Sequence, residues 1–498
     1  MNINPETVKL LPTTLISKYQ IFPLSVNQGR MTLIMADPLN YQAIDDVRIS
    51  TGMDVVPVMA SERELESAIQ QYTALQVDSK MEKLLGELNQ YNYGAVVETE
   101  SPEMELADDA PVIRMVNSLL KQAVQGGASD IHIEPLEQDV RVRFRIDGEL
   151  WEVLSLPTKS FPATVSRIKI MANLDISEKR VPQDGRTRLI IDGREIDFRI
   201  STLPSIHGEK IVLRILDRAN AIMSLEKLGF SPTNEQRIKS LIRRPHGMVI
   251  VTGPTGSGKT TTLYTMIDYL NSDEVNIYTI ENPVEKTIKN INQIQINELA
   301  GINYVNTLKA LLRQDPDIIV VGEIRDSEEA DITLRVSLTG HLVMTTIHAN
   351  TALDSISRLL DMDIDPYVMG TSSLGFMSQR LVRTLCPYCK RKVKKLPPNE
   401  KTWLDIKVKE NNMKDVDINS FYEPVGCIHC NNGYKGRIAV AEIVEVSDKM
   451  KKLISQKAGI TEIKKEAILS GYKSLTQRGI EKVVEGKTSL EEIMKQTI

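Results

Sequence analysis

The sequence of 498 residues has no long hydrophobic run, little cysteine and no strong excess of either charge. No apolar run approaches the ~18 residues that a membrane-spanning helix requires. The first residues, MNINPETVKL, lack the basic and apolar regions of a secretory signal. The net charge of −5 and the pI near 5.9 give no global case for binding nucleic acid. We therefore expect a cytoplasmic protein that reaches a membrane only through a partner.

The length and the composition indicate a soluble protein of several domains. A chain of 498 residues is too long for one core and suggests about three to four domains at ~100–200 residues each. Hydrophobic residues make up 41% and charged residues 26%, as in ordinary globular proteins. Changes in pattern predict an N-terminal domain at 1–75, an acidic linker at 76–108, an α+β domain at 109–220, an α/β domain at 221–385, a cysteine region at 386–440 and a helical end at 441–498.

The second domain is predicted to contain a helix and antiparallel hairpins. PVIRMVNSLLKQAVQ, which starts at Pro111, has apolar residues at helical spacing and stops at a pair of glycines. Two alternating segments then turn at Asp147–Gly148 and at Asp192–Gly193, which are hairpin signals. In the first hairpin, Arg141, Arg143 and Arg145 share one face, which we interpret as a solvated or interdomain surface rather than a catalytic one.

The third domain shows short, wholly apolar runs between helical stretches. The runs are MVIV (248–251), IYTI (277–280), IIVV (318–321) and LVMTTI (342–347). Apolar strands that alternate with helices predict a parallel sheet that is covered on both faces.

A glycine-rich loop follows the first of these strands and precedes a helical pattern. Phosphates need close backbone N–H groups, the positive end of a helix, a lysine at the β and γ oxygens, and a hydroxyl on Mg²⁺. A chance glycine-rich turn is the alternative, but strand, loop and helix occur in the required order. The predicted nucleotide-binding residues are Gly253, Pro254, Thr255, Gly256, Ser257, Gly258, Lys259, Thr260 and Thr261.

Ionisable residues follow three of the other apolar strands. IYTI ends at Glu281, IIVV leads into Glu323, and LVMTTI leads into His348. Ligands of parallel sheets bind at the carboxyl ends of the strands, so these side chains are expected at the same edge as the glycine-rich loop. Phosphoryl transfer needs a held metal and an oriented water, which these groups can supply.

The cysteines form two CxxC pairs, Cys386/Cys389 and Cys427/Cys430, separated by residues 390–426. Four thiolates complete a tetrahedral structural Zn²⁺ site, and an insert such as KLPPNEKTWLDIK would account for the long gap. A redox CxxC is the main alternative, although one pair would suffice for it. His429 lies between two cysteines and is interpreted as a bystander.

The segments GPTGSGKTTTLY, TIENPVE, LRQDPDIIVVGEIRDSEEA and TGHLVMTTIHAN resemble the Walker A, Asp, Walker B and His boxes of the secretion ATPase superfamily. The branch is that of the type II secretion and type IV pilus assembly ATPases, GspE and PilB. The resemblance implies a RecA-like ATPase domain preceded by a PAS-like α+β domain, with ATP and Mg²⁺ as ligands. It also implies that Lys259 and Thr260 bind phosphate and Mg²⁺, that Glu323 holds the metal's water shell and that Glu281 orients the attacking water.

The resemblance extends to residues outside the glycine-rich loop. It implies that His348, together with His341, monitors the γ-phosphate, and that Arg199 and Arg214 of the preceding domain complete the nucleotide site. A solvated cross-strand ion pair is the alternative for Arg199. The family's Asp box usually reads Glu-Asp-Pro, whereas this chain has Asn282, which removes one negative charge.

The function expected from this resemblance is a homo-hexameric ATPase that drives extension of a type IV pilus. Type II secretion pseudopilus assembly is the alternative, followed by a nucleic-acid translocase and by a module that binds nucleotide without hydrolysis. The expected partners are the inner-membrane platform protein and cytoplasmic assembly proteins, and nucleic acid is not expected among them. The N-terminal domain resembles the later part of the family's platform-binding domain.

Overall fold

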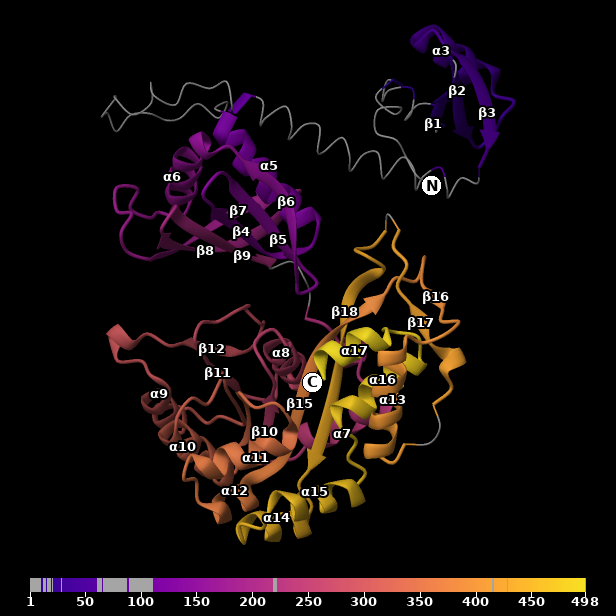
Figure 1. Cartoon of the computed structure of the whole chain (residues 1–498). Coiled ribbons are helices and arrows are strands. Elements are labelled where there is room, and N and C mark those ends of the chain that lie inside the picture. Colours follow the sequence, from indigo (N-terminus) through magenta and orange to yellow (C-terminus); the bar gives the residue numbers. More distant parts are fainter. Residues whose placement is uncertain are drawn as a thin grey trace. The chain divides into compact units, whose positions relative to one another are not determined.

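The computed structural model describes residues 10, 11, 15, 19, 21–27, 29–60, 65, 87, 88, 111–217, 222–413, 416–427 and 429–497. The chain divides into two compact units, Met1–Leu216 and Asp217–Ile498 (Figure 1). Within the described residues, no helix is both long enough and apolar enough to cross a membrane.

The N-terminal part of the first unit is a small three-stranded sheet in the order β1-β2-β3. β1 and β2 are antiparallel, and the helix α3 connects β2 to the parallel strand β3. Phe22, Leu33 and Val47 belong to its buried core. The elements are β1 (Ile21–Asn27), β2 (Arg30–Met35), α3 (Tyr41–Thr51) and β3 (Asp54–Met59).

The linker predicted at 76–108 lies outside the described residues, apart from Glu87 and Leu88. Both are helical, Leu88 is buried in the core of the following α+β part, and Glu87 forms an ion pair with Arg114 at 2.7 Å. Leu88 is therefore packed against the following part of the unit, whereas Glu87 is exposed at its surface.

The second part of the first unit is a six-stranded sheet in the order β6-β5-β4-β9-β8-β7, with two helices. The pairs β4–β5, β5–β6, β4–β9 and β7–β8 are antiparallel. The elements are α5 (Pro111–Gln125), β4 (Ala128–Pro135), β5 (Val140–Ile146), β6 (Glu149–Leu156), α6 (Phe161–Met171), β7 (Gln183–Ile191), β8 (Arg194–Ser205) and β9 (Gly208–Asp217).

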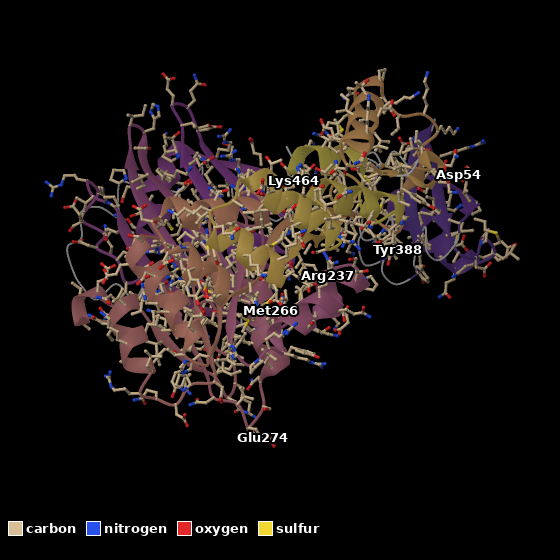
Figure 2. All side chains as sticks on the ribbon, turned by 90° about the horizontal axis from the view of Figure 1, so that it is seen from below. Asp54, Arg237, Met266, Glu274, Tyr388 and Lys464 are labelled. Carbon is tan, nitrogen blue, oxygen red and sulfur yellow. The ribbon has the colours of Figure 1, made fainter. Side chains whose placement is uncertain are left out.

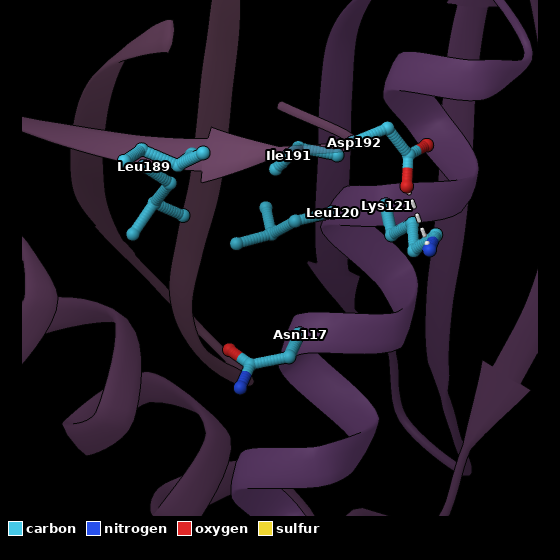
Figure 3. A pocket seen from close by; sticks show the side chains of 7 residues that line it. Asn117, Leu120, Lys121, Leu189, Ile191 and Asp192 are labelled. Carbon is cyan, nitrogen blue, oxygen red and sulfur yellow. Dashed lines mark ion pairs between the residues drawn. The ribbon is translucent and has the colours of Figure 1, made fainter. Parts of the chain in front are cut away.

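Both predicted hairpin turns are present in this sheet. Asp147 and Gly148 have φ of 50° and 94°, and Asp192 and Gly193 have φ of 50° and 76°. Two successive residues with positive φ match the right-handed twist of the flanking strands. A pocket of about 310 Å³ lies between α5 and β7, lined by Leu120 and Leu189 among others, with an ion pair of 2.8 Å between Lys121 and Asp192 at its rim (Figure 3).

The second unit is built on a seven-stranded sheet in the order β12-β11-β13-β14-β10-β15-β18. Its first six strands are mutually parallel, and β10, β11, β13 and β14 are the four strands that the apolar runs predicted. The seventh strand, β18, is antiparallel to β15 and was not predicted. The strands are β10 (Gly247–Thr252), β11 (Ile277–Glu281), β12 (Asn292–Gln295), β13 (Ile318–Val321), β14 (Leu342–Ile347), β15 (Ser373–Leu385) and β18 (Tyr434–Glu445).

Helices cover both faces of this sheet. Ile250 of β10 belongs to one buried core and Val249 to the other, because successive residues of a strand face opposite sides. Met266 of α8 lies inside the unit, whereas Glu274 lies at its outer edge (Figure 2). The helices are α7 (Pro232–Ile242), α8 (Lys259–Leu270), α9 (Tyr304–Leu311), α10 (Ser327–Leu338), α11 (Ala352–Asp361) and α12 (Pro366–Ser372).

The cysteine region and the C-terminal helices pack around the same sheet. The limit expected at residue 440 falls inside β18, so the cysteine region and the helical end share a strand with the central sheet. The remaining elements are β16 (Arg391–Lys392), α13 (Pro398–Glu410), β17 (Tyr422–Glu423), α14 (Asp448–Ser455), α15 (Ile460–Leu469), α16 (Leu475–Val484) and α17 (Leu490–Gln496).

Candidate functional site

The glycine-rich loop connects β10 to α8 at the carboxyl edge of the sheet. α8 begins at Lys259, so the N–H groups of its first turn are directed towards the loop. Gly253 has a φ of 146°, and a Cβ there would lie 2.6 Å from the Ser257 hydroxyl and 2.7 Å from the Gln379 carbonyl oxygen. The loop therefore requires glycine for steric reasons as well as for close approach of a phosphate.

Lys259 lies across the loop. Its Nζ donates to the carbonyl oxygens of Gly253 at 2.8 Å and Pro254 at 3.1 Å. Burial lowers the pKa of Lys259, the charge of Glu323 opposes this shift, and the charge of Arg380 adds to it. The lysine is thus in the electrostatic field of both side chains, at the position where phosphate oxygens bind in a loop of this kind.

Gln379 of β15 forms a hydrogen bond with the glycine-rich loop, and the sequence analysis did not identify it as a site residue. Its Nε2 donates to the carbonyl oxygen of Ser257 at 2.7 Å, and its Oε1 accepts from the hydroxyl of Thr262 at 2.8 Å. The side chain is 1% exposed. The available signal was the run of polar residues Ser378, Gln379 and Arg380 between the non-polar segments 374–377 and 381–382.

Glu323 and His348 lie together at the ends of the adjacent strands β13 and β14. His348 Nε2 is 3.6 Å from Glu323 Oε2, and Arg325 donates to the other carboxylate oxygen. The charge of Glu323 also acts on Lys259, and the N–H of Ala349, next to His348, donates to Thr252 at the end of β10, so these residues lie at the same edge of the sheet as the loop. A carboxylate beside a phosphate-binding lysine can hold water molecules of a bound Mg²⁺.

Glu281 ends β11, beside β13, and is only 5% exposed. Its carboxylate accepts hydrogen bonds from the hydroxyl of Tyr264 on α8, from Thr279 Oγ1 at 2.6 Å and from Gln293 Nε2 at 3.1 Å. Tyr264 is in the helix that starts at the glycine-rich loop, so Glu281 is tied directly to that helix. The next residue, Asn282, is exposed.

His341 lies at the other edge of the sheet. It precedes β14, and its carbonyl oxygen accepts a hydrogen bond from Gly247 at the start of β10. His348 follows it by seven positions, across the whole of β14, which corresponds to about 23 Å at ~3.3 Å per residue. This placement corrects the expectation that His341 monitors the γ-phosphate together with His348.

The two arginines expected from the resemblance belong to the first unit. Arg214 Nε is 3.1 Å from Asp130 Oδ1 on the neighbouring strand, while the arginine side chain stays 57% exposed. Arg199 lies on the non-core face of β8 opposite Arg186. Asp197, the partner considered for Arg199, accepts from Arg188 Nε at 2.8 Å.

The alternating arginines of β5 are paired with acids on β4. Arg143 Nη2 donates to Glu134 at 2.9 Å, and Arg141 and Lys210 also contact this carboxylate. Burial alone would raise the pKa of Glu134, but its bonds and attraction to Arg143 and Lys210 outweigh burial and lower the pKa to about 2. Arg145 Nε lies 3.8 Å from Asp130.

The four cysteines converge on one point, with all Sγ atoms within 4.8 Å of one another. Cys386–Cys427, Cys389–Cys430 and Cys427–Cys430 have Sγ separations of 3.8, 3.7 and 3.6 Å. A disulfide requires about 2.05 Å. Tetrahedral zinc with Zn–S bonds of ~2.3 Å places its sulfurs about 3.8 Å apart. The residues therefore fit a Zn²⁺ ion, and α13 lies in the insert between the two pairs.

Comparison with known proteins shows which family the chain belongs to. The family model described as type II/IV secretion system protein matches residues 105–495, and the MshEN domain model matches residues 1–79. The type IV pilus assembly ATPase PilB of Myxococcus xanthus is 43% identical over 500 residues, which is 100% of this chain and 87% of that protein. The type II secretion system ATPase E of Vibrio cholerae is 41% identical over 502 residues, covering 99% and 97%.

A solved structure shows the same fold. The pilus retraction motor PilT with bound ADP is 26% identical, with a TM-score of 0.51, and the match covers 77% of this chain and 95% of that chain. The chain therefore belongs to the type II/IV secretion system protein family and is a P-loop ATPase related to the pilus assembly and type II secretion ATPases.

Proposed function

We propose that this chain hydrolyses ATP as a homo-hexamer to power extension of a type IV pilus. The observation that carries the proposal is the convergence of Lys259, Glu323 and His348 at the glycine-rich loop, with Glu281 bonded to the helix that follows it. Identity of 43% over the whole chain with a pilus assembly ATPase supports the cellular role.

The geometry supports a different role for each of these residues. Lys259 and the N–H groups of the first turn of α8 bind the phosphates, and Thr260 supplies a hydroxyl for the metal. A bound Mg²⁺ would neutralise charge on the β and γ oxygens. Glu323 holds the water shell of this ion, Glu281 orients the attacking water, and His348 contacts the γ-phosphate beside Glu323.

The partners follow from the same relationship. We propose that the N-terminal domain binds an inner-membrane platform protein and that the ATPase works with cytoplasmic assembly proteins at the inner face of the membrane. Zn²⁺ at the four cysteines has a structural role, because four protein ligands leave no open position for a substrate. Arg199 and Arg214 complete the nucleotide site from the preceding domain, since an arginine fork suits the charge of a transferring phosphoryl group.

Substitution of Lys259 by Ala tests the assignment of the glycine-rich loop. The change removes the cation that contacts the phosphates, so we expect a loss of Mg²⁺-dependent ATP hydrolysis of at least ~100-fold. Phosphate release and circular dichroism of the purified protein measure turnover and fold. Lys289→Ala, which alters an exposed lysine of the same unit, is the matched control. Near-normal turnover by Lys259→Ala would refute the assignment.

The cellular role is tested in the host organism. Deletion of the gene should abolish surface pili, and the wild-type chain, but not Lys259→Ala, should restore them. Loss of secreted enzymes with pili intact would instead assign the chain to type II secretion. Turnover that increases several-fold with added DNA would favour a nucleic-acid translocase, and nucleotide binding without any turnover would favour a regulatory module.

A further inference from the structure

The loop at residues 348–351, which carries His348, is anchored on the side of β10. Thr252, the last residue of β10, donates from its hydroxyl to the carbonyl oxygen of Ile347 at 2.8 Å. The same hydroxyl accepts from the N–H of Ala349 at 2.8 Å. The loop is therefore fixed to the strand that leads into the phosphate-binding loop.

A second anchor comes from β15. The hydroxyl of Ser378 and Nη2 of Arg380 both donate to the carbonyl oxygen of Asn350, at 3.0 and 2.9 Å. The charge of Arg380 also acts on Lys259 and on Glu442. Arg380 is thus within electrostatic range of both the phosphate-binding lysine and a buried acid that has no part in the proposed reaction.

That acid, Glu442 of β18, forms the third anchor. One carboxylate oxygen accepts from the N–H of Ala352, the first residue of α11, at 2.6 Å. The other accepts from the Tyr472 hydroxyl at 2.9 Å and from the N–H of Leu475, the first residue of α16, at 2.8 Å. One carboxylate, 1% exposed, therefore joins the start of the helix after the His348 loop to the C-terminal helices.

The stability of α11 alone does not explain a buried acid at this position. Thr351 and Asp354 already form a capping box at the start of this helix. Burial raises the pKa of Glu442, so the charge is costly, and its three hydrogen bonds and the positive ends of two helices offset that cost. Glu442 adds a connection between α11 and α16 that the capping box cannot provide.

We propose that Glu442 is a positioning residue. It fixes the position of the His348 loop relative to the C-terminal helices. It acts through α11, whose first N–H it binds, and it touches neither nucleotide nor metal. A displacement of α16 would move the start of α11 and hence His348 relative to Glu323. The proposal rests on the proposed function in one respect, namely that His348 contributes to turnover.

A double-mutant cycle with Glu442→Gln and His348→Ala in the full-length protein tests this proposal. The amide keeps the size of the side chain but can no longer accept hydrogen bonds at both ends. We expect kcat to fall about tenfold or more, with the Kd for Mg-ADP changed by less than about twofold. In the His348→Ala background, Glu442→Gln should have almost no further effect on kcat, because the imidazole that Glu442 positions is already absent.

Glu492→Gln is the matched control. Glu492 is also a buried acid, 2% exposed, but it accepts from Arg383 on another part of β15 and does not contact the His348 loop. Its effect on kcat should add to that of His348→Ala, whereas the effect of Glu442→Gln should not. Additive effects of Glu442→Gln would overturn the proposal, and so would unchanged kcat in His348→Ala.

Tyr472→Phe is the second variant if Glu442→Gln fails to fold. It removes one donor from the C-terminal side and leaves the bond between Glu442 and Ala352 in place. A fall in kcat of about threefold or more that vanishes in the His348→Ala background supports the proposal, and an additive effect overturns it. Failure of the proposed function is recognised separately, because wild-type protein would then hydrolyse no more ATP than Lys259→Ala.

Discussion

Glu281 and Glu323 end adjacent parallel strands, but their surroundings differ at the scale of single residues. Glu281 is 5% exposed and accepts three hydrogen bonds, whereas the side chain of Glu323 is 27% exposed among Arg325, His348 and Lys259. A carboxylate fixed by three donors suits the orientation of a single water molecule. A more exposed carboxylate beside the phosphate-binding lysine suits the hydration shell of a metal ion.

Glutamine substitutions should therefore have different effects at the two positions. Glu281→Gln should bind Mg-ATP tightly but turn over at least ~100-fold more slowly, a loss of about 2.7 kcal/mol of transition-state stabilisation. Glu323→Gln should instead require more Mg²⁺ for half-maximal turnover, because its amide holds the metal's waters less well. Nucleotide affinity and turnover are measured across a Mg²⁺ titration for each variant. Normal turnover by Glu281→Gln, with tight binding and no hydrolysis by Glu323→Gln, would reverse the two roles.

At the scale of secondary-structure elements, the pairing of two strands explains how the two CxxC motifs form one four-cysteine site. Each CxxC pair is local, but Cys386 directly follows β15 and Cys427 precedes β18, which are antiparallel neighbours. Pairing of these strands brings together thiols that lie far apart in the sequence. α13, with its buried Leu404, packs in the C-terminal core. The insert that the long gap predicted is thus a helix with its own packing.

Purified protein should contain about one zinc ion per chain. Cys386→Ser should lower the zinc content and the melting temperature, because the closed site crosslinks the ends of β15 and β18. Elemental analysis and thermal unfolding with and without a chelator provide the measurements. Ser155→Ala, a change in the first unit, is the control and should keep the metal. Metal-free protein that forms reversible disulfides would favour the redox interpretation.

At the scale of the whole molecule, the proposed machinery is divided between two compact units. Lys259, Glu281, Glu323 and His348 belong to Asp217–Ile498, while Arg214 belongs to Met1–Leu216. Arg214 is 57% exposed although it contacts Asp130, so its guanidinium retains donors that a phosphate can use. Asp130 also has Arg145 nearby at 3.8 Å, so removal of Arg214 leaves this acid with a cationic neighbour.

Arg214→Ala should lower kcat at least ~30-fold while the protein stays folded and hexameric, because the lost cation would act on the transferring phosphoryl group. Arg188→Ala is the control, since Arg188 is a similarly exposed arginine paired with an acid on the same sheet. Turnover assays and analytical ultracentrifugation with nucleotide measure the two properties. Equal activity of both variants would leave Arg214 as a partner of Asp130 only, and a monomer under all conditions would refute the hexamer.

The sequence by itself determined the features that depend on neighbouring residues. The glycine-rich loop, the hairpin turns at Asp147 and Asp192, the apolar strands and the CxxC pairs each lie within a few residues of the chain. Local backbone preferences and strand periodicity suffice to recognise them. The location of Glu323 and His348 at one edge of the sheet was also predictable, because the carboxyl ends of parallel strands lie at the same edge.

The tertiary structure alone decided which distant side chains support that edge. Gln379 bonds to Ser257 across 122 positions, and Glu442 bonds to Ala352 across 90. No local preference encodes such contacts, because they arise only when β15 and β18 join the sheet beside β10. The course of β14 places His341 at the opposite edge, beside the start of β10, although it stands in one motif with His348. A motif specifies which residues are present, whereas the direction of each strand decides which end of the sheet they reach.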